Sequence, residues 1–365
     1  MADTLNQFSR RMKAFYEEIY NNQTGGMMGL DDFIFNTLDS DADSANFALD
    51  ELVVNPHAVV FRRRGEQSAV RPYVPGVGNV YEIPRVSEKT AITEVLRDAV
   101  VAGGEATEGF SSRMARLIQQ IITQHTVGHN IGRWKLALDV IRTGIFAPTG
   151  LQGADLGLSI DQSRDASLDV TYDFTAGGAT IHNAMAELYD AYRALNGSAA
   201  NVIMIMGEEW LEEFEADDDV IEYMKANTAN VLLQREMIPP AVMNTSGLNL
   251  VARWRIPGRT FPINICTYDP QSQYVQYKGA TATKFMPDDE CVIFDANSTR
   301  YKVQRGVDVL SDSGKATRAV GDIVFDQYTE KDPVETLLRS QARYAFIAGN
   351  INHTARSTGT FAEDS

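Results

Sequence analysis

A single long helical pattern, between residues 107 and 142, limits what this chain can fold into. Apolar residues and one glycine recur there three, four or seven positions apart: Phe110, Met114, Leu117, Ile121, Gly128, Ile131, Trp134, Leu138 and Ile141. This spacing predicts one helix from about Thr107 to Arg142, bent near Gly128. At ~1.5 Å per residue the helix is roughly 50 Å long. Since helices in globular proteins average about 11 residues, such a helix is unusual in a chain of 365 residues.

The rest of the chain mixes helical and strand-like segments. Helical patterns cover residues 3–20, 182–195 and 207–226, and strand-like runs cover 168–174, the apolar 202–206 and several short segments between 247 and 294. No βαβ repeat connects them, so the fold class is predicted to be α+β. The polar end, 351–365, is expected to be loose.

A basic, proline-containing stretch precedes the long helix at residues 61–85. It holds two acids and five arginines, namely Arg62, Arg63, Arg64, Arg71 and Arg85. Three prolines and three glycines exclude a helix across it, and its ends look extended. The stretch predicts a long two-armed loop, and loops of ~25 residues without a core of their own are usually functional.

Acidic residues dominate elsewhere, since the formal net charge is -16 and the isoelectric point is near 4.8. This balance argues against sequence-independent binding of nucleic acid, which needs clustered Lys and Arg. Residues 28–51 hold seven acids and no base, and residues 1–52 are interpreted as an arm. Eight further acids lie within residues 208–219: Glu208, Glu209, Glu212, Glu213, Glu215, Asp217, Asp218 and Asp219.

The sequence contains no membrane or secretion signal that we recognise. The longest apolar run, residues 202–206, is far short of the ~20 residues needed to span a bilayer. The first twenty residues lack the apolar centre of a signal peptide. Cys266 and Cys291 are interpreted as isolated core residues in a reducing compartment.

Candidate catalytic and metal-binding patterns are weak. Asp39, Asp41 and Asp43 have the first three spacings of a calcium loop, but Ser44 replaces its glycine and Asp50 its glutamate. The loop is therefore interpreted as a solvated acidic segment.

Two histidines, His125 and His129, lie four apart on the long helix, as a zinc pair would. Without an HExxH glutamate or a third ligand, they are interpreted as buried or interfacial. The stretch TAGGAT, residues 175–180, is interpreted as a turn because it fits neither the dinucleotide nor the P-loop pattern. We predict no catalytic residue, cofactor or metal.

Four ordered stretches resemble the tailed-phage major capsid protein family of the lambda type (phage capsid protein E), which has the HK97 fold. They are VVFRRRGEQSAVRPYVPGVGNVYEIP, the break and long helix after it, NVIMIMGEEWLEEFEADDDVIEYMKA, and INICTYDPQSQYVQYKGATATKFMPDDECVIFD. They cover roughly residues 50–300. The resemblance implies an N-terminal arm (1–52), an extended loop (53–90), a peripheral domain (91–200) with the spine helix at about 107–142, an axial domain (201–295), and a return to the peripheral domain with a C-terminal tail (296–365).

The resemblance also implies a function, which is that of a non-enzymatic shell subunit forming hexamers and pentamers of an icosahedral phage head. The head would enclose double-stranded DNA without reading its sequence. Its implied partners are a separate scaffold protein, a portal and a decoration protein, with assembly in the host cytoplasm and a final place in the virion. An encapsulin-type shell, or a metal-dependent enzyme using residues 208–219, remains an alternative.

The extended loop of the resemblance lies over a neighbouring subunit, which suggests what the basic residues contact. We expect the arginines of residues 62–85 to meet acidic surface on an adjacent copy. The acidic candidates are Asp39, Asp41, Asp43, Glu208, Glu209, Glu212 and Glu213. About 55 residues precede the loop, enough for an arm but too few for a fused scaffold, so we expect no large N-terminal segment to be removed.

The sequence predicts that assembled chains are not joined covalently. A lysine-to-asparagine cross-link needs an amine in the loop, yet no lysine lies between Lys13 and Lys89, and arginine is a poor nucleophile. Denaturing electrophoresis of mature particles without reductant should therefore give a single band at the chain mass of 40.3 kDa. A ladder of pentamers and hexamers would refute this.

Overall fold

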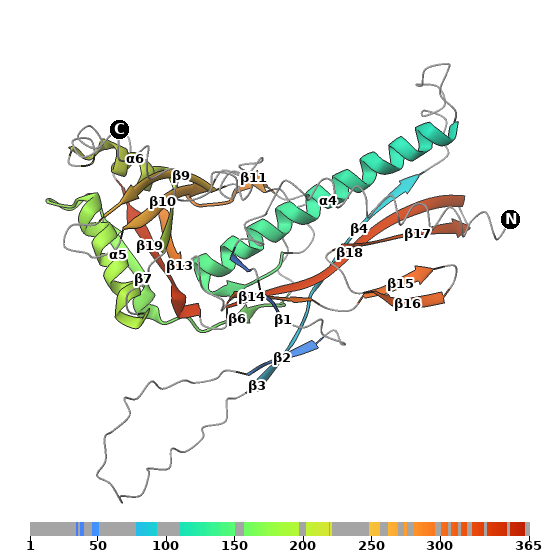
Figure 1. Ribbon diagram of the computed structural model, residues 1–365, viewed down its shortest axis with the longest axis horizontal. Coiled ribbons are helices and arrows are strands. Elements are labelled where there is room, and N and C mark those ends of the chain that lie inside the picture. Colours follow the sequence, from blue (N-terminus) through green and yellow to red (C-terminus); the bar gives the residue numbers. More distant parts are fainter. Residues whose placement is uncertain are drawn as a thin grey trace, which may run out of the picture.

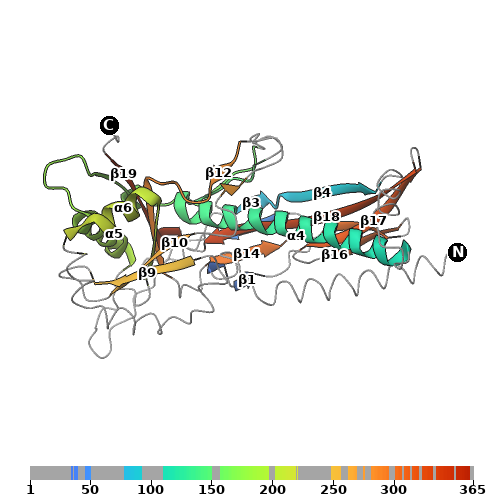
Figure 2. The same ribbon diagram turned by 90° about the horizontal axis from the view of Figure 1, so that it is seen from above.

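The computed structural model describes residues 34–35, 37–39, 46–50, 78–92, 110–149, 157–196, 202–218, 220, 248–255, 262–268, 274–275, 281–295, 301–305, 308–312, 315–319, 323–331, 334–348 and 351–361. Within these residues the main features are two sheets and the long helix α4, Phe110–Thr143. The body is elongated, with one sheet toward each end and α4 running along much of its length (Figures 1 and 2). The predicted long helix and the mixture of helices and strands are confirmed.

One sheet has five strands built around a single long strand. Their bounds are β1 Thr37–Asp39, β4 Arg85–Ile92, β14 Tyr301–Arg305, β17 Val324–Lys331 and β18 Val334–Ala348. β18 pairs antiparallel with β14, β17 and β4, and β1 pairs parallel with β14. Because β18 pairs with three of the other four strands, it holds this sheet together.

The other sheet has six strands in the order β7-β19-β13-β8-β10-β9. Their bounds are β7 Asp169–Asp173, β8 Val202–Met206, β9 Leu248–Trp254, β10 Ile263–Tyr268, β13 Glu290–Asp295 and β19 Thr354–Thr360. All five residues of β8 are buried, as its apolar run predicts. Helices α5, Ile181–Asn196, and α6, Glu208–Ala216, share an apolar cluster with this sheet (Figure 1).

Smaller elements complete the described fold. Two-stranded pairs are β2 Asn46–Asp50 with β3 Gly78–Glu82, β5 Ile145–Phe146 with β6 Ile160–Asp161, β11 Tyr274–Val275 with β12 Thr283–Lys284, and β15 Asp308–Asp312 with β16 Lys315–Ala319. Short 3-10 helices are η2 Ala166–Leu168 and η3 Ile351–His353. None of the helices in the described ranges is long and apolar enough to cross a bilayer.

Helix α4 contributes to two separate apolar clusters. Its N-terminal half packs Ile118 and Ile121 with Ile92 of β4 and Leu338 of β18. Its C-terminal half is buried in a larger cluster whose other members come from both sheets, including Phe346 of β18 and Phe294 of β13. The end of α4 therefore fills a core that the two sheets share.

One of the expected features of the fold is corrected by the sheet topology. Residues 354–360, expected in a loose tail, form β19 between β7 and β13. Apart from Arg356, the residues of β19 are small and mostly polar, which conceals the strand in the sequence, yet Thr354, Ser357 and Gly359 are buried. Residues 169–196 provide β7 of the same sheet and α5, which shares its apolar cluster.

Other expected elements are confirmed or lie outside the described residues. Helix α5 matches the pattern at 182–195, and Thr175–Gly178 form the expected turn before it. The expected helix at 3–20 and most of residues 219–226 lie outside the described residues. The single helix expected over 207–226 is wrong at its centre, because Asp217 has extended backbone angles and ends α6 at Ala216.

The turn between β8 and α6 leaves no room for a side chain at Gly207. A Cβ placed there would lie 2.2 Å from the backbone oxygen of Pro287 and 2.4 Å from that of Asp288. The Gly207 amide also donates to the Glu290 carbonyl oxygen at 2.8 Å, which fixes this close approach. Backbone atoms cannot swing aside as a flexible side chain can.

We predict that Gly207→Ala lowers the free energy of unfolding by about 3 kcal/mol, because overpacking against fixed atoms forces the backbone apart. Gly177→Ala is the matched control, since a Cβ at Gly177 meets nothing within 4 Å. Urea unfolding of the purified chain measures both. If the two variants are equally stable, the backbone around Gly207 leaves room for a Cβ and the prediction is wrong.

Candidate functional site

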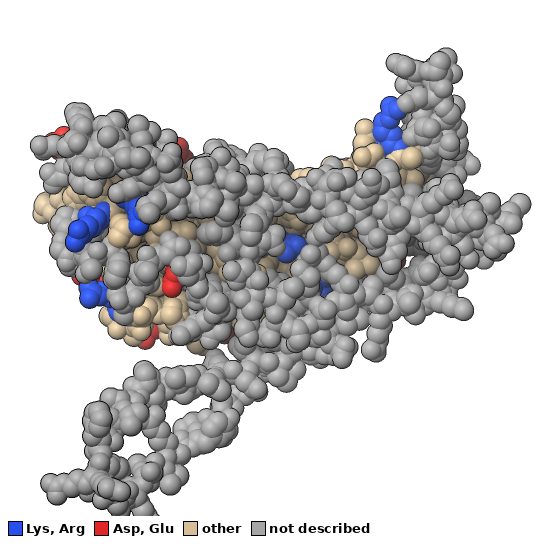
Figure 3. All heavy atoms as spheres, in the orientation of Figure 1, with Lys and Arg blue, Asp and Glu red and all other residues tan. Residues whose placement is uncertain are grey.

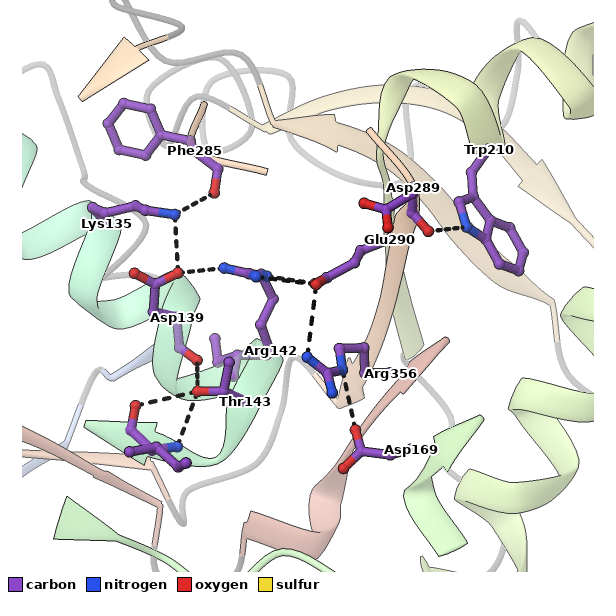
Figure 4. Close-up of polar contacts among 12 residues, drawn as sticks. Lys135, Asp139, Arg142, Thr143, Asp169, Trp210, Phe285, Asp289, Glu290 and Arg356 are labelled. Carbon is purple, nitrogen blue, oxygen red and sulfur yellow. Dashed lines mark hydrogen bonds and ion pairs between the residues drawn. The ribbon is translucent and has the colours of Figure 1, made fainter. Parts of the chain in front are cut away.

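A chain of charged side chains connects the end of α4 to the six-stranded sheet; we call it the junction network (Figure 4). Its members are Lys135, Asp139, Arg142, Glu290, Arg356 and Asp169. On α4, Asp139 Oδ1 accepts from Lys135 Nζ at 3.0 Å and from Arg142 Nη1 at 2.5 Å. These spacings of three and four residues place the three side chains on one helix face.

Arg142 carries the network from the helix to the sheet. Its Nε and Nη2 donate to the two carboxylate oxygens of Glu290 at 2.6 and 3.1 Å, a two-point geometry that fixes both groups. Arg356 Nη1 lies 3.6 Å from Glu290 Oε1, and its Nε donates to Asp169 Oδ1 at 3.1 Å. The network thus joins α4, β13, β19 and β7.

Pairing offsets the cost of burying these charges. Burial alone would raise the pKa of Glu290, but hydrogen bonds and positive charge from Arg142, with Arg356 and Lys135, hold that pKa below its usual value. Burial would likewise lower the pKa of Arg142, and Glu290 and Asp139 raise it. Every charged group of the network has an opposite partner, so the arrangement suits structural support rather than proton transfer.

A turn before β13 lies against the N-terminus of α6. The Asp289 carbonyl oxygen accepts from Trp210 Nε1 at 2.9 Å and from the Gly359 amide at 2.7 Å. Lys284 Nζ bridges Glu208, at 2.8 Å, and Asp288, at 2.7 Å. Together these segments and α4 line an open groove of about 700 Å³.

Most of the side chains that line the groove are charged. Its lining residues are Lys135, Asp139, Arg142, Glu209, Thr283, Lys284, Pro287, Asp288 and Asp289. It contains neither a His nor a Cys, and among the described residues no group of three or more His, Cys, Asp or Glu is placed to hold a metal ion.

The predicted acidic helix face is present on α6. Trp210 and Phe214 are buried beneath the helix, and Glu212 and Glu213 are exposed. Burial, followed by the negative charges of Asp289, Asp288 and Glu212, raises the pKa of Glu209. Glu208, Glu209, Glu212 and Glu213 therefore lie on one short helix and form a local concentration of negative charge.

Two of the other predicted contact residues are among the described residues. Arg85 opens β4 and is exposed, and Asp39 ends β1. The remaining ones lie outside the described residues: Arg62, Arg63, Arg64, Arg71, Asp41 and Asp43. The acidic segment with Asp39, Asp41 and Asp43, which we interpreted as solvated, falls largely outside them as well.

The two histidines of α4 each contact a different strand. His125 Nε2 lies 2.8 Å from Thr90 Oγ1 of β4, and His129 Nε2 lies 2.9 Å from Ser340 Oγ of β18. Both side chains are buried, as expected for interfacial histidines. Burial, with the nearby charges of His125 and Arg133, lowers the pKa of His129 to about 4.

The histidine contacts lie between the two apolar clusters of α4, so the middle of the helix is held to the sheet by polar groups. Burial also lowers the pKa of His125, partly offset by Glu88. Both imidazoles are therefore neutral near pH 7.

The two cysteines are core residues, as expected. Both are free and buried, and burial raises the pKa of the Cys266 thiol to about 12.

Comparison with known proteins identifies the chain's relatives. The family model described as "Phage major capsid protein E" matches residues 28–353. A crystal structure from E. coli CFT073, described as the capsid protein of a prophage, has 12% identity and a TM-score of 0.60, covering 96% of this chain and 98% of that chain. No curated protein sequence matches.

Two further structures align over most of this chain at lower similarity. The mature capsid of bacteriophage PhiM1 has 12% identity and a TM-score of 0.46, covering 91% of this chain and 87% of that chain. The holo-SrpI encapsulin complex from Synechococcus elongatus PCC 7942 has 8% identity and a TM-score of 0.39, covering 87% and 83%.

The buried histidines predict a pH-dependent stability. Below its ordinary pKa of about 6.5 the unfolded chain binds a proton at residue 129, whereas the folded chain does so only near pH 4. The contribution of neutral His129 to the free energy of unfolding is therefore complete above pH 6.5. It is lost as the pH falls toward 4, at up to ~1.4 kcal/mol per pH unit.

His129→Gln should therefore flatten the fall of the melting temperature between pH 6.5 and 4.5, because glutamine does not titrate there. Val127→Gln, on the exposed side of the same helix turn, is the control and should keep the original slope. The account of His129 is wrong if both variants follow the unmodified protein.

Proposed function

Since this chain belongs to the family of phage major capsid proteins of type E, we propose that it is the subunit of an icosahedral phage head built from hexamers and pentamers. The family match over residues 28–353 is the observation that carries this function. It makes the chain a structural shell protein of a tailed phage and not an enzyme. The HK97-like α+β architecture fits this role, with a long helix beside an elongated body.

The two sheets suggest how the subunit is oriented within a hexamer or pentamer. We assign the six-stranded sheet, with α5 and α6, to the axial domain near the centre of each hexamer or pentamer. The five-stranded sheet and the N-terminal half of α4 then form the peripheral domain at its boundary. In this assignment β7, α5 and β19 belong to the axial domain, because they share its sheet and apolar cluster.

Contacts between copies are proposed to be electrostatic. The arginines of residues 62–85 supply the positive side, and the exposed Glu212 and Glu213 of α6 the clearest negative side. An exposed pair is worth only ~0.2–1 kcal/mol. Contacts this weak suit a shell in which individual contacts between subunits must break and re-form during assembly.

Further partners follow from the same proposal. A separate scaffold protein, a portal and a decoration protein would act with this chain, and assembly would take place in the host cytoplasm before DNA fills the head. An encapsulin-type shell would instead close around cargo protein without a portal. The family match favours the phage head.

Reversing the charge of the loop tests both the function and the contact. Arg62→Glu, Arg63→Glu and Arg64→Glu together should block closed shells and leave the circular dichroism of the subunit unchanged. Raising the salt to 1 M should weaken assembly of the unmodified chain, because the Debye length shortens from ~10 to ~3 Å. Negative-stain microscopy measures both.

A compensating variant is the matched control. The double variant Glu212→Lys with Glu213→Lys should restore shells if these side chains are the partners. It is tested in two ways, by mixing it with the triple variant and by combining all five substitutions in one chain. Arg193→Glu, an exposed reversal on α5, should have no effect. Normal heads from the triple variant would refute the loop contact, whereas an unmodified chain that forms no shell even with the other head proteins would refute the function.

A further inference from the structure

Strand β19 joins two parts of the six-stranded sheet that do not pair with each other directly. It lies between β7, with which it pairs parallel, and β13, with which it pairs antiparallel (Figure 1). Within the described part of the chain, β7 pairs with β19 alone. Helix α5 also contacts β19, whose fully buried Ala355 belongs to the same apolar cluster. β19 therefore attaches β7 to the sheet and helps to hold α5 on it.

The other four strands of this sheet lie close together in the sequence. β8, β9, β10 and β13 all fall within residues 202–295, and they pair in the order β13-β8-β10-β9. Arg356 of β19, by contrast, is 187 positions from its partner Asp169 of β7. Because the entropy lost on closing a loop increases with its length, the pairings within 202–295 are the easier ones to form. We therefore expect a four-stranded sheet that can exist before β19 is added.

The far end of β19 is held by two neighbouring segments. The Gly359 amide donates to the Asp289 carbonyl oxygen at 2.7 Å, and this oxygen also accepts from Trp210 Nε1 of α6. The Phe361 ring stacks on the ring of Phe174, which directly follows β7, with the centroids 4.7 Å apart. Residues 354–361 are thus held along the strand and at its end, and we call them the strap.

The strap also completes the junction network (Figure 4). Arg356 is its contribution, with Nε donating to Asp169 Oδ1 at 3.1 Å and Nη1 lying 3.6 Å from Glu290 Oε1. Glu290 in turn holds Arg142 at the end of α4. Insertion of the strap therefore connects β7 to the charged groups that orient α4.

We propose that the strap is the closing part of the subunit, and that a copy whose strap is not inserted is left out of the shell. In such a copy β7 has lost its partner strand and β13 is an open edge, so the six-stranded sheet lacks the form that neighbouring copies meet. Open sheet edges also pair with strands of other chains, so excluding these copies protects the shell from wrong contacts. This inference rests on the proposed head function and adds the conformational step that makes a subunit competent to assemble.

Hydrogen exchange of the full chain tests whether the strap opens separately. Ala355→Asp places an unpaired charge in the apolar cluster and should keep the strap out, because burying such a charge is very costly. Exchange should rise in residues 169–173, 181–196 and 354–360, and stay unchanged in β8 and β10. A rise throughout the six-stranded sheet, or no rise at all, would overturn the inference.

Ala194→Asp is the matched control, since it makes the same change at an exposed position of α5. The described surface over this end of the molecule already shows Lys, Arg, Asp and Glu atoms (Figure 3). One more carboxylate there should therefore leave the exchange unchanged.

Incorporation into shells tests the consequence for assembly. Each variant carries a tag and is produced together with the unmodified chain and the other head proteins. The share of Ala355→Asp chains in purified shells should be roughly tenfold or more below that of Ala194→Asp chains. Equal shares would contradict the inference. An unmodified chain that forms no shell would instead contradict the head function, while the exchange result would still stand.

A peptide of residues 351–361 separates an open strap from a general loss of stability. Added in excess to the purified Ala355→Asp chain before mixing with the unmodified chain, it should occupy the place between β7 and β13 and restore incorporation. The same peptide with Ala355→Asp is the control and should restore nothing. No difference between the two peptides would contradict the proposal that the strap is the missing part.

Discussion

The end of α4 must lie in one core with both sheets, and the rest of the fold depends on this. Leu138, Val140 and Ile141 are fully buried there. A helix that carries charged groups into such a place needs partners for them, and Arg142 and Glu290 supply the two-point contact. Breaking a buried pair by removing one partner costs far more than the pair is worth. The junction network therefore makes the orientation of the helix relative to the six-stranded sheet specific.

The other half of α4 is attached differently, and this has consequences for its surface. Ile118, Ile121 and His125 are turned toward the five-stranded sheet, so the opposite side of the helix is left in solvent. That side is free of acids although the chain as a whole is strongly acidic. The two halves of α4 thus differ, since one is buried between both sheets and the other is packed on one side only.

The parts of the fold that could be predicted are those whose signal repeats within one segment. The long helix and the helix that ends at Asn196 each show an apolar period, and the strand at 202–206 is a continuous apolar run. β19 could not be predicted, because Thr354, Ser357 and Gly359 are small or polar and become a strand only between β7 and β13. In the junction network the spacing of Lys135, Asp139 and Arg142 is visible in the sequence, but the step from Arg142 to Glu290 spans 148 positions and leaves no local signal.

Above all, we propose that this chain forms a closed shell with its six-stranded sheets around the capsomer centres. Electron cryomicroscopy of assembled particles tests it most directly. We predict an icosahedral shell of hexamers and pentamers in which the six-stranded sheets meet at the capsomer centres and the five-stranded sheets lie at the boundaries. A small open oligomer, or a shell with the five-stranded sheets at the capsomer centres, would contradict this arrangement.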